Sequence, residues 1–334
     1  MIQPQQTFDF KLGIIVCCML FWGCQSAAPS ENEQRTSINP SKQATHRIDS
    51  AKLDQDTSWT YITEADTFPA PQLPTFQKNT TAKPLQWEKL EQGLDVATVD
   101  APITCSIGDS KIRIVRVNPS QFDFKLLAIH ELQEEQMRTA EQYCEDFQLL
   151  GAINTSMFAY NMRSVGYMKN YTHLNNGKLN ADKCIIAFNP KNQTVPAFKI
   201  IDLGCEDWEQ WKDQYHSYIQ NIRMIDCNQR VKWSKQEKFW STACMGEDGK
   251  GNALFIHCRS PYRVHDFAKM LLQLPIDLKR CCYLEGGPES TLYVKTGAME
   301  LRSYGSYETG FNEDDDNNAM WQIPNIIGFT RKKR

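Results

Sequence analysis

The sequence lacks the cysteine and histidine spacings, the excess of positive charge and the long apolar runs that define several large classes of protein. No Cys-x-x-Cys pair and no His-x-x-x-His pair occurs, so no zinc site, and no resident metal or cofactor, is indicated. Lys plus Arg number 37 and Asp plus Glu 40, a net charge of −3, which gives no electrostatic reason to expect a nucleic-acid partner. No apolar run reaches the roughly 20 residues that cross a bilayer. What remains is a globular chain of 334 residues, 41% of them hydrophobic, with no internal repeat.

The first 24 residues are typical of an export signal. Residues 12–22 are apolar and uncharged, follow Lys11, and have the length of a signal-peptide core. A small residue precedes Cys24, as in a bacterial lipoprotein signal, although Phe21 and Trp22 depart from that pattern. The segment therefore predicts lipidation at Cys24 and a bacterial lipoprotein of the cell envelope, periplasmic or outer-membrane, held by its lipid anchor. An ordinary cleaved signal peptide or an uncleaved anchor fits the same residues.

The remaining chain divides into a linker and one folded domain. Residues 25–85 are rich in Ser, Thr, Gln, Asn and Pro without apolar periodicity, which predicts a flexible linker. From 86 to 331 the pattern becomes regular, and strands and helices are interleaved. We expect an α+β fold, with helices packed on a mixed β-sheet in a single domain. Helices are predicted over 136–148, 205–218 and 264–272, and strands include 94–103, 111–117, 122–129, 149–157, 184–188, 197–203, 253–258, 281–284, 292–295 and 323–329.

The domain contains nine cysteines: Cys105, Cys144, Cys184, Cys205, Cys227, Cys244, Cys258, Cys281 and Cys282. Nine is an odd number, so at least one thiol is free. Several of these cysteines lie in apolar runs, where a free thiol behaves as a small hydrophobic group. We expect most to be free and buried, and one or two disulfides remain open in an oxidising compartment.

Two segments contain polar residues at the ends of apolar runs. The first, residues 151–158, places Asn154 and two hydroxyls in such a run, where buried polar groups need partners. A ligand would supply them, or Asn154 bridges a local turn. The second, residues 283–293, places Glu285 and Glu289 around two glycines. Burial of Glu285 would raise its pKa, and paired carboxylates are what glycosidic cleavage uses. A tight hairpin with solvated carboxylates is the alternative.

Taken together, the two segments resemble those of the phosphodiester glycosidase family, in a bacterial lipoprotein branch of it. The family's Asn-Gly-Gly-Phe-Phe-like segment is matched by residues 154–158, and its Asp-Gly-Gly-Gly-Ser segment by residues 285–290. A final strand with a Val-Pro-Asn-like start is matched by residues 323–329. The similarity extends over roughly 90–330. It implies an extracytoplasmic hydrolase that cleaves a sugar-1-phosphodiester in envelope glycans or glycoconjugates.

The resemblance also implies roles for individual residues. Glu285, Glu289 and Asn154 form the catalytic set, in which Glu285 is acid/base or nucleophile and Glu289 supports it or binds sugar hydroxyls. The family's arginine before its Thr-Ala-Val-Gly segment is absent, so another arginine is expected to bind phosphate. The substrate-binding candidates are Arg163, Arg223, Arg259, Ser260, Arg263, Gly286, Gly287 and Ser290.

Two alternative functions, neither of them enzymatic, fit the same sequence. A glycan-binding envelope lipoprotein without catalysis would use the same scaffold, and the altered glycine motif and missing arginine favour it. A structural envelope protein would use the linker to reach a partner. Convergence of Glu285, Glu289, Asn154 and an arginine in one cleft would favour the enzyme, whereas an aromatic face without them would favour binding.

Overall fold

A computed structural model describes residues 73–333, and this part of the chain is mainly β-structure. Strands make up 45% and helices 11%, so the expected α+β class is wrong. Every strand pair in residues 73–333 is antiparallel, so the sheets are not mixed either. Residues 1–72, with Cys24 and the predicted signal, lie outside the described part. None of the described helices is long and apolar enough to cross a membrane.

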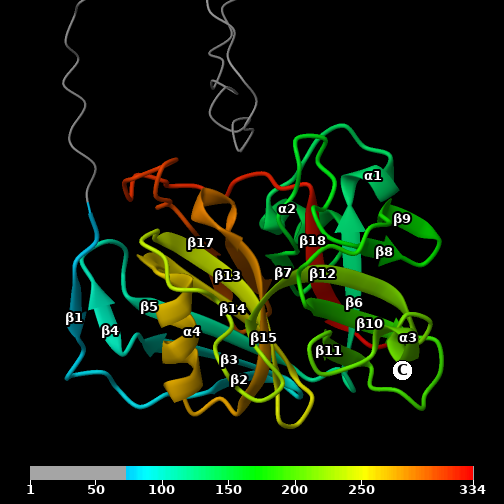
Figure 1. Cartoon of the computed structure of the whole chain (residues 1–334), viewed down its shortest axis with the longest axis horizontal. Helices are drawn as coiled ribbons and strands as arrows, with labels where there is room; N and C mark the ends of the chain where they lie inside the picture. The colour runs from blue at the N-terminus through cyan, green and yellow to red at the C-terminus, as the bar shows by residue number, and fades with distance from the viewer. Residues whose placement is uncertain (1–72, 334) are drawn as a thin grey trace, which may run out of the picture. The chain divides into compact units, whose positions relative to one another are not determined.

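The strands of residues 73–333 form three sheets, and Figure 1 labels most of these strands. The largest has the order β11-β10-β12-β15-β13-β14-β5-β3-β2, with β8 paired to β12 and β9 paired to β8. Its strands are β2 (Glu88–Glu91), β3 (Leu94–Asp100), β5 (Lys111–Val117), β8 (Met168–Asn170), β9 (His173–Asn176), β10 (Cys184–Pro190), β11 (Phe198–Asp202), β12 (Tyr215–Ile225), β13 (Trp240–Asp248), β14 (Ala253–Tyr262) and β15 (Leu278–Gly286).

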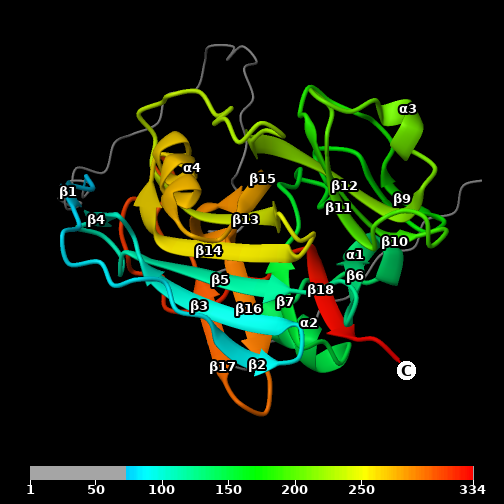
Figure 2. The same ribbon diagram turned by 90° about the horizontal axis from the view of Figure 1, so that it is seen from below.

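The second sheet has the order β17-β16-β7-β18-β6. Its strands are β6 (Phe122–Ala128), β7 (Gly151–Asn154), β16 (Thr291–Lys295), β17 (Glu300–Tyr304) and β18 (Asn325–Arg331). In Figure 2, β14, β5, β3 and β2 run side by side, and strands of the second sheet cross them. The third sheet pairs β1 (Phe76–Lys78) with β4 (Ile103–Cys105). Because β1 lies within the stretch 25–85, part of the predicted linker is paired with the body.

The helices are short: α1 (Ile129–Leu132), α2 (Ala140–Asp146), α3 (Trp208–Trp211) and α4 (Val264–Gln273). The helix predicted over 264–272 is present as α4. The helix predicted over 136–148 is shorter, because Thr139 forms a capping box with Gln142 that starts α2 there. The helix predicted over 205–218 is reduced to α3, because strand β12 begins at Tyr215. Of its apolar residues, Tyr215 and Tyr218 belong to the buried strand β12, whereas Trp208 and Trp211 belong to α3.

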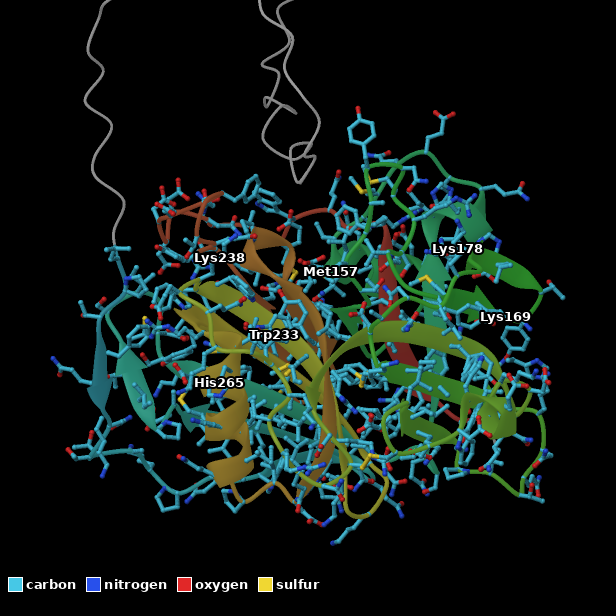
Figure 3. The ribbon with its side chains drawn as sticks, in the orientation of Figure 1. Met157, Lys169, Lys178, Trp233, Lys238 and His265 are labelled. Carbon is cyan, nitrogen blue, oxygen red and sulfur yellow. A yellow bond between two sulfur atoms is a disulfide. The ribbon has the colours of Figure 1, made fainter. Side chains whose placement is uncertain are left out.

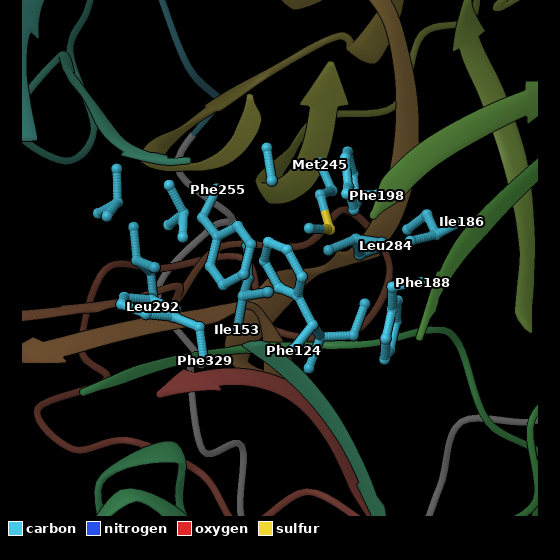
Figure 4. Packing of buried hydrophobic residues seen from close by; sticks show 14 of the residues in the cluster. Phe124, Ile153, Ile186, Phe188, Phe198, Met245, Phe255, Leu284, Leu292 and Phe329 are labelled. Carbon is cyan, nitrogen blue, oxygen red and sulfur yellow. The ribbon is translucent and has the colours of Figure 1, made fainter. Parts of the chain in front are cut away.

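The central strands are buried on both faces, which explains why strand content exceeds the expectation. In β5, Ile112 and Ile114 join one core and Val115 and Val117 join another. The core between the two large sheets, shown in Figure 4, includes Phe124, Ile153, Met245, Phe255, Leu284 and Phe329. The opposite face of the large sheet is covered by α4. Runs that are apolar on both faces lose the simple alternation of a half-buried strand.

Two disulfides join parts of the chain that are distant in sequence. Cys184 of β10 is bonded to Cys282 of β15, and Cys205 is bonded to Cys227. The free thiols found in residues 73–333 are those of Cys105, Cys144, Cys244, Cys258 and Cys281, and all five are buried. The prediction of at least one free thiol is therefore confirmed.

Candidate active site

A cavity of about 490 Å³ lies where β15 ends, and its walls come from four separate stretches of chain. Glu285 and Tyr283 belong to β15, Trp240 opens β13, and Glu289 follows β15 in a 3-10 turn. Figure 3 labels Met157, Trp233 and Lys238, which come from two of the loops around this cavity. The lining residues are Met157, Phe158, Val165, Ile222, Trp233, Gln236, Lys238, Trp240, Tyr283, Glu285, Glu289, Glu308 and Thr309.

Three carboxylates face this cavity: Glu285, Glu289 and Glu308. Burial raises the pKa of Glu285 well above its usual value, and the negative charges of Glu289 and Glu308 raise it further. The Gly286 N–H, which donates to Glu285 Oε1 at 3.1 Å, opposes this shift only in part. The same three carboxylates and burial also raise the pKa of Tyr283. The site is therefore suited to hold a carboxyl in its protonated form.

The two glycines of the second motif let the chain turn tightly beside these groups. Gly287 has φ +64°, and a Cβ there would lie 2.3 Å from Glu308 Oε2. At Gly286 a Cβ would lie 2.4 Å from the Tyr283 hydroxyl. Their absent side chains allow Glu308 and Tyr283 to approach the turn. This is a conformational role, and the predicted contact of both glycines with substrate stays a prediction.

Ser290 and His257 support the turn from inside the protein. The Ser290 hydroxyl donates to the Gly287 carbonyl at 2.8 Å, and its oxygen lies 3.3 Å from His257 Nε2. On the other side of the ring, Ser303 Oγ lies 2.6 Å from Nδ1. Burial is the main reason that the pKa of His257 is lowered to about 3, so the ring is neutral. A neutral ring accepts from Ser303 and donates to Ser290, which fixes the turn.

Asn154 connects the two segments that the sequence singled out. It ends β7, and its Oδ1 accepts the Thr291 N–H at 2.9 Å, directly after the second motif. Its Nδ2 is buried and has no hydrogen-bond partner among residues 73–333, as is true of the Thr155 hydroxyl. Asn154 is not among the residues that line the cavity, whereas Met157 and Phe158, which follow it in the chain, are. It holds the motif that contains Glu289.

None of the four candidate arginines lines this cavity, nor does Ser260, and each of the five is engaged by protein groups. Arg163 donates to the Asn175 carbonyl at 2.7 Å. Arg223 pairs with buried Asp202, Arg259 with Asp315, and Arg263 with Glu237. Ser260 Oγ accepts the Ser110 N–H at 2.7 Å.

Sequence reasoning missed Lys238, Glu308 and an aromatic wall. The ring centroids of Trp233 and Tyr283 lie 4.9 Å apart, and those of Trp233 and Trp240 lie 6.3 Å apart. Faces of indole and phenol rings bind the apolar faces of sugars and other flat groups. The signal was present as the tryptophan- and lysine-rich stretch 232–240, which no motif singled out.

One group of metal-ligand type occurs in residues 73–333: Asp202 with Cys205 and Cys227. The two cysteines are bonded to each other, which removes their thiolates as ligands. Asp202 itself is paired with Arg223. This group therefore serves as a structural link between β11 and the end of β12.

Comparisons with known proteins identify the family of this domain. A family model for phosphodiester glycosidases matches residues 147–330, which include both motifs and all the residues that line the cavity. No curated protein sequence matches the chain.

Solved structures similar to this one are distant in sequence. The catalytic domain of zebrafish N-acetylglucosamine-1-phosphodiester alpha-N-acetylglucosaminidase, described as auto-inhibited by its pro-peptide, has a TM-score of 0.50 and 11% identity, covering 78% of this chain and 88% of that one. A hypothetical protein from Synechocystis has a TM-score of 0.48 and 13% identity over 75% of this chain, which spans 64% of that protein. The zebrafish domain supports the fold, and the family model matches more than half of the residues, so the chain belongs to the phosphodiester glycosidase family.

Proposed function

We propose that the protein hydrolyses the bond between the anomeric carbon of a sugar and a phosphodiester, in glycans or glycoconjugates of a bacterial cell envelope. The observation that supports this most directly is Glu285, a carboxyl whose pKa is raised by burial and by Glu289 and Glu308 in the cavity of a phosphodiester glycosidase domain. A carboxyl whose pKa is raised in this way is suited to general-acid catalysis.

In the proposed reaction, water attacks the anomeric carbon and the bond from that carbon to the phosphate oxygen breaks. Glu285 gives its proton to the departing phosphate oxygen, and Glu289 accepts a proton from the water. The products are a free sugar and a phosphomonoester. Phosphate is a good leaving group, so the reaction needs less help from the acid than hydrolysis of an alkyl glycoside and more stabilisation of the phosphate charge.

The proposed location rests on the N-terminal signal pattern and on the disulfides. Residues 12–24 resemble a lipoprotein signal, with Cys24 as the lipidated residue. The bonds Cys184–Cys282 and Cys205–Cys227 are typical of an oxidising compartment. A membrane-anchored protein of the envelope would meet both conditions.

A second candidate function is glycan binding without catalysis. It is favoured by the aromatic wall of Trp233, Trp240 and Tyr283 and by the engagement of all four candidate arginines in protein contacts. In this case the carboxylates would accept hydrogen bonds from sugar hydroxyls and no bond would break.

The deciding experiment compares the full wild-type chain with Glu285→Gln and Glu209→Gln on a panel of sugar-1-phosphodiesters. Free sugar and phosphomonoester are quantified. Glu209 is an exposed carboxylate of α3 that pairs with Lys212, far from the motif in sequence, and controls for loss of a charge. We expect turnover that Glu285→Gln abolishes and Glu209→Gln leaves unchanged. Binding of glycans with no turnover of any diester would reject the enzyme in favour of the second candidate.

A further inference from the structure

The loop between β12 and β13, residues 226–239, brings nitrogen donors to the cavity. Trp233, Gln236 and Lys238 all line the cavity from this loop. Glu285, Glu289 and Glu308 line the same cavity and bring carboxyl groups. The cavity lining therefore combines nitrogen donors from one loop with carboxyl groups from other parts of the chain.

The Gln236 side chain has a donor that the protein does not use. Its Nε2 is buried and has no hydrogen-bond partner in the part of the chain that the structure describes. A buried amide nitrogen without an acceptor is unfavourable, and a bound ligand is one way to satisfy it. The acceptor must enter through the cavity that Gln236 lines.

Lys238 is the cation that the same loop brings to the cavity. Within residues 73–333 it forms no ion pair, whereas its neighbour Glu237 pairs with Arg263. The nearest acidic group in sequence is thus already neutralised. Lys238 is an exposed residue of the cavity lining.

The ends of this loop are held in place. At its start, the Asp226 carboxylate accepts the N–H groups of Asn228 and Arg230, each at 2.9 Å. At its end, the Phe239 N–H donates to Thr309 Oγ1 at 2.9 Å. Because Phe239 follows Lys238 directly, the position of the lysine backbone is fixed relative to the cavity. Fixed donors lose less entropy when a ligand binds.

We infer that Gln236 and Lys238 form the phosphate subsite of this cavity, in the role for which the sequence led us to expect an arginine. The phosphate of the diester lies between the amide and the ammonium, and the sugar lies toward Glu285 beside the indole rings. This inference rests on the proposed function. It assigns phosphate recognition to a point charge and one amide, which suits the single negative charge of a phosphodiester.

The first test measures binding without catalysis. Inorganic phosphate is titrated into the full chain while tryptophan fluorescence is recorded, since Trp233 and Trp240 line the cavity. Lys238→Gln and Gln236→Leu remove the donors, Lys238→Arg keeps the charge, and Lys235→Gln removes a neighbouring lysine outside the cavity lining. We expect saturable quenching in wild type, dissociation constants raised roughly 10- to 100-fold in Lys238→Gln and raised in Gln236→Leu, and near-wild-type binding in the other two.

The second test measures hydrolysis of a sugar-1-phosphodiester and of a neutral aryl glycoside of the same sugar. We expect Lys238→Gln to raise KM for the diester and to leave kcat/KM for the aryl glycoside unchanged. Equal effects of Lys238→Gln and Lys235→Gln, or wild type without saturable quenching, would overturn the subsite. Diester turnover insensitive to Lys238→Gln would overturn the subsite and leave the proposed function standing. Phosphate binding through Lys238 without diester turnover would overturn the proposed function and leave the phosphate subsite standing.

Discussion

Gly287 has a backbone conformation that favours glycine, and it lies against the carboxylate of Glu308. Gly287→Ala should therefore change both the stability and the activity of the protein. Its φ of +64° lies in the left-handed region, where a Cβ costs about 1–2 kcal/mol. The new Cβ would also lie 2.3 Å from Glu308 Oε2 and 3.2 Å from Glu308 Cβ, too close for either atom to stay. Glu308 must therefore move, and it is one of the charges that raise the pKa of Glu285.

Gly251→Ala provides the matched control for this prediction. Gly251 has φ +77° in the turn between β13 and β14, and nothing lies within 4 Å of a Cβ there. The Gly251→Ala variant should lose about 1–2 kcal/mol of unfolding free energy, the cost of a Cβ in the left-handed region, and should keep full activity. The free energy of unfolding, measured in guanidinium, should fall more in Gly287→Ala than in Gly251→Ala. Gly287→Ala should also lose activity on the preferred diester. Equal losses of unfolding free energy, together with unchanged activity, would refute the placement of Glu308 against the turn.

Further predictions concern titration, the long disulfide and the buried histidine. Activity should fall as pH rises through the raised pKa of Glu285, and Glu308→Gln should move this limb of the pH profile to lower pH, since it removes a negative charge that raises that pKa and leaves Glu289 in place; a limb that does not move would contradict the coupling. Replacing Cys184 and Cys282 by Ala should lower the free energy of unfolding by about 4–5 kcal/mol, because the bond closes a loop of 98 residues; urea denaturation of wild type and variant measures it. The pKa of His257 is lowered to about 3, so the unfolded state binds more protons below its own pKa of about 6.5, and wild-type stability should fall between these values as the pH is lowered. His257→Gln should flatten this part of the curve, and denaturation midpoints measured from pH 7 to pH 4 for both proteins would test it.

The sequence identified the two motifs because each interrupts an apolar run with polar groups in a local pattern. That they meet through Asn154 Oδ1 and the Thr291 N–H is a contact over 137 residues, which periodicity cannot show. The family resemblance supplied the pairing of the motifs, and the family model then matched both. Local pattern and resemblance together thus indicated the region of the site.

The arginines could not be assigned from sequence because their partners are set by tertiary structure. Arg223 is held by Asp202, 21 residues earlier, and Arg259 by Asp315, 56 residues later. Each of these carboxylates forms an ion pair with an arginine that the sequence had made a candidate for binding phosphate. Lys238 was overlooked because it belongs to no motif, and the pairing of its adjacent acid, Glu237, with Arg263 is likewise set by tertiary structure.

The fold class was mispredicted for a related reason. In a half-buried strand one face is polar, so a run that is apolar at most positions resembles a helix segment as readily as a strand. The stretch that includes Tyr215 and Tyr218 was assigned to a helix, yet both tyrosines are fully buried in β12. Burial on both faces results from the layering of two sheets and α4, which only the tertiary structure reveals.

The charge arrangement around Glu285 links binding and catalysis in the proposed reaction. In the sheet, Glu285 lies opposite Ala243, which offers no cation, and the charges that act on it are those of Glu289 and Glu308. A cavity with three ionised carboxylates would repel an anionic phosphodiester, and one cation at Lys238 would offset only part of that repulsion. Protonation of Glu285 removes one of these charges and also supplies the proton for the leaving group. A rise in pH should therefore raise KM and lower kcat together, whereas a purely catalytic role for the proton would lower kcat and leave KM unchanged.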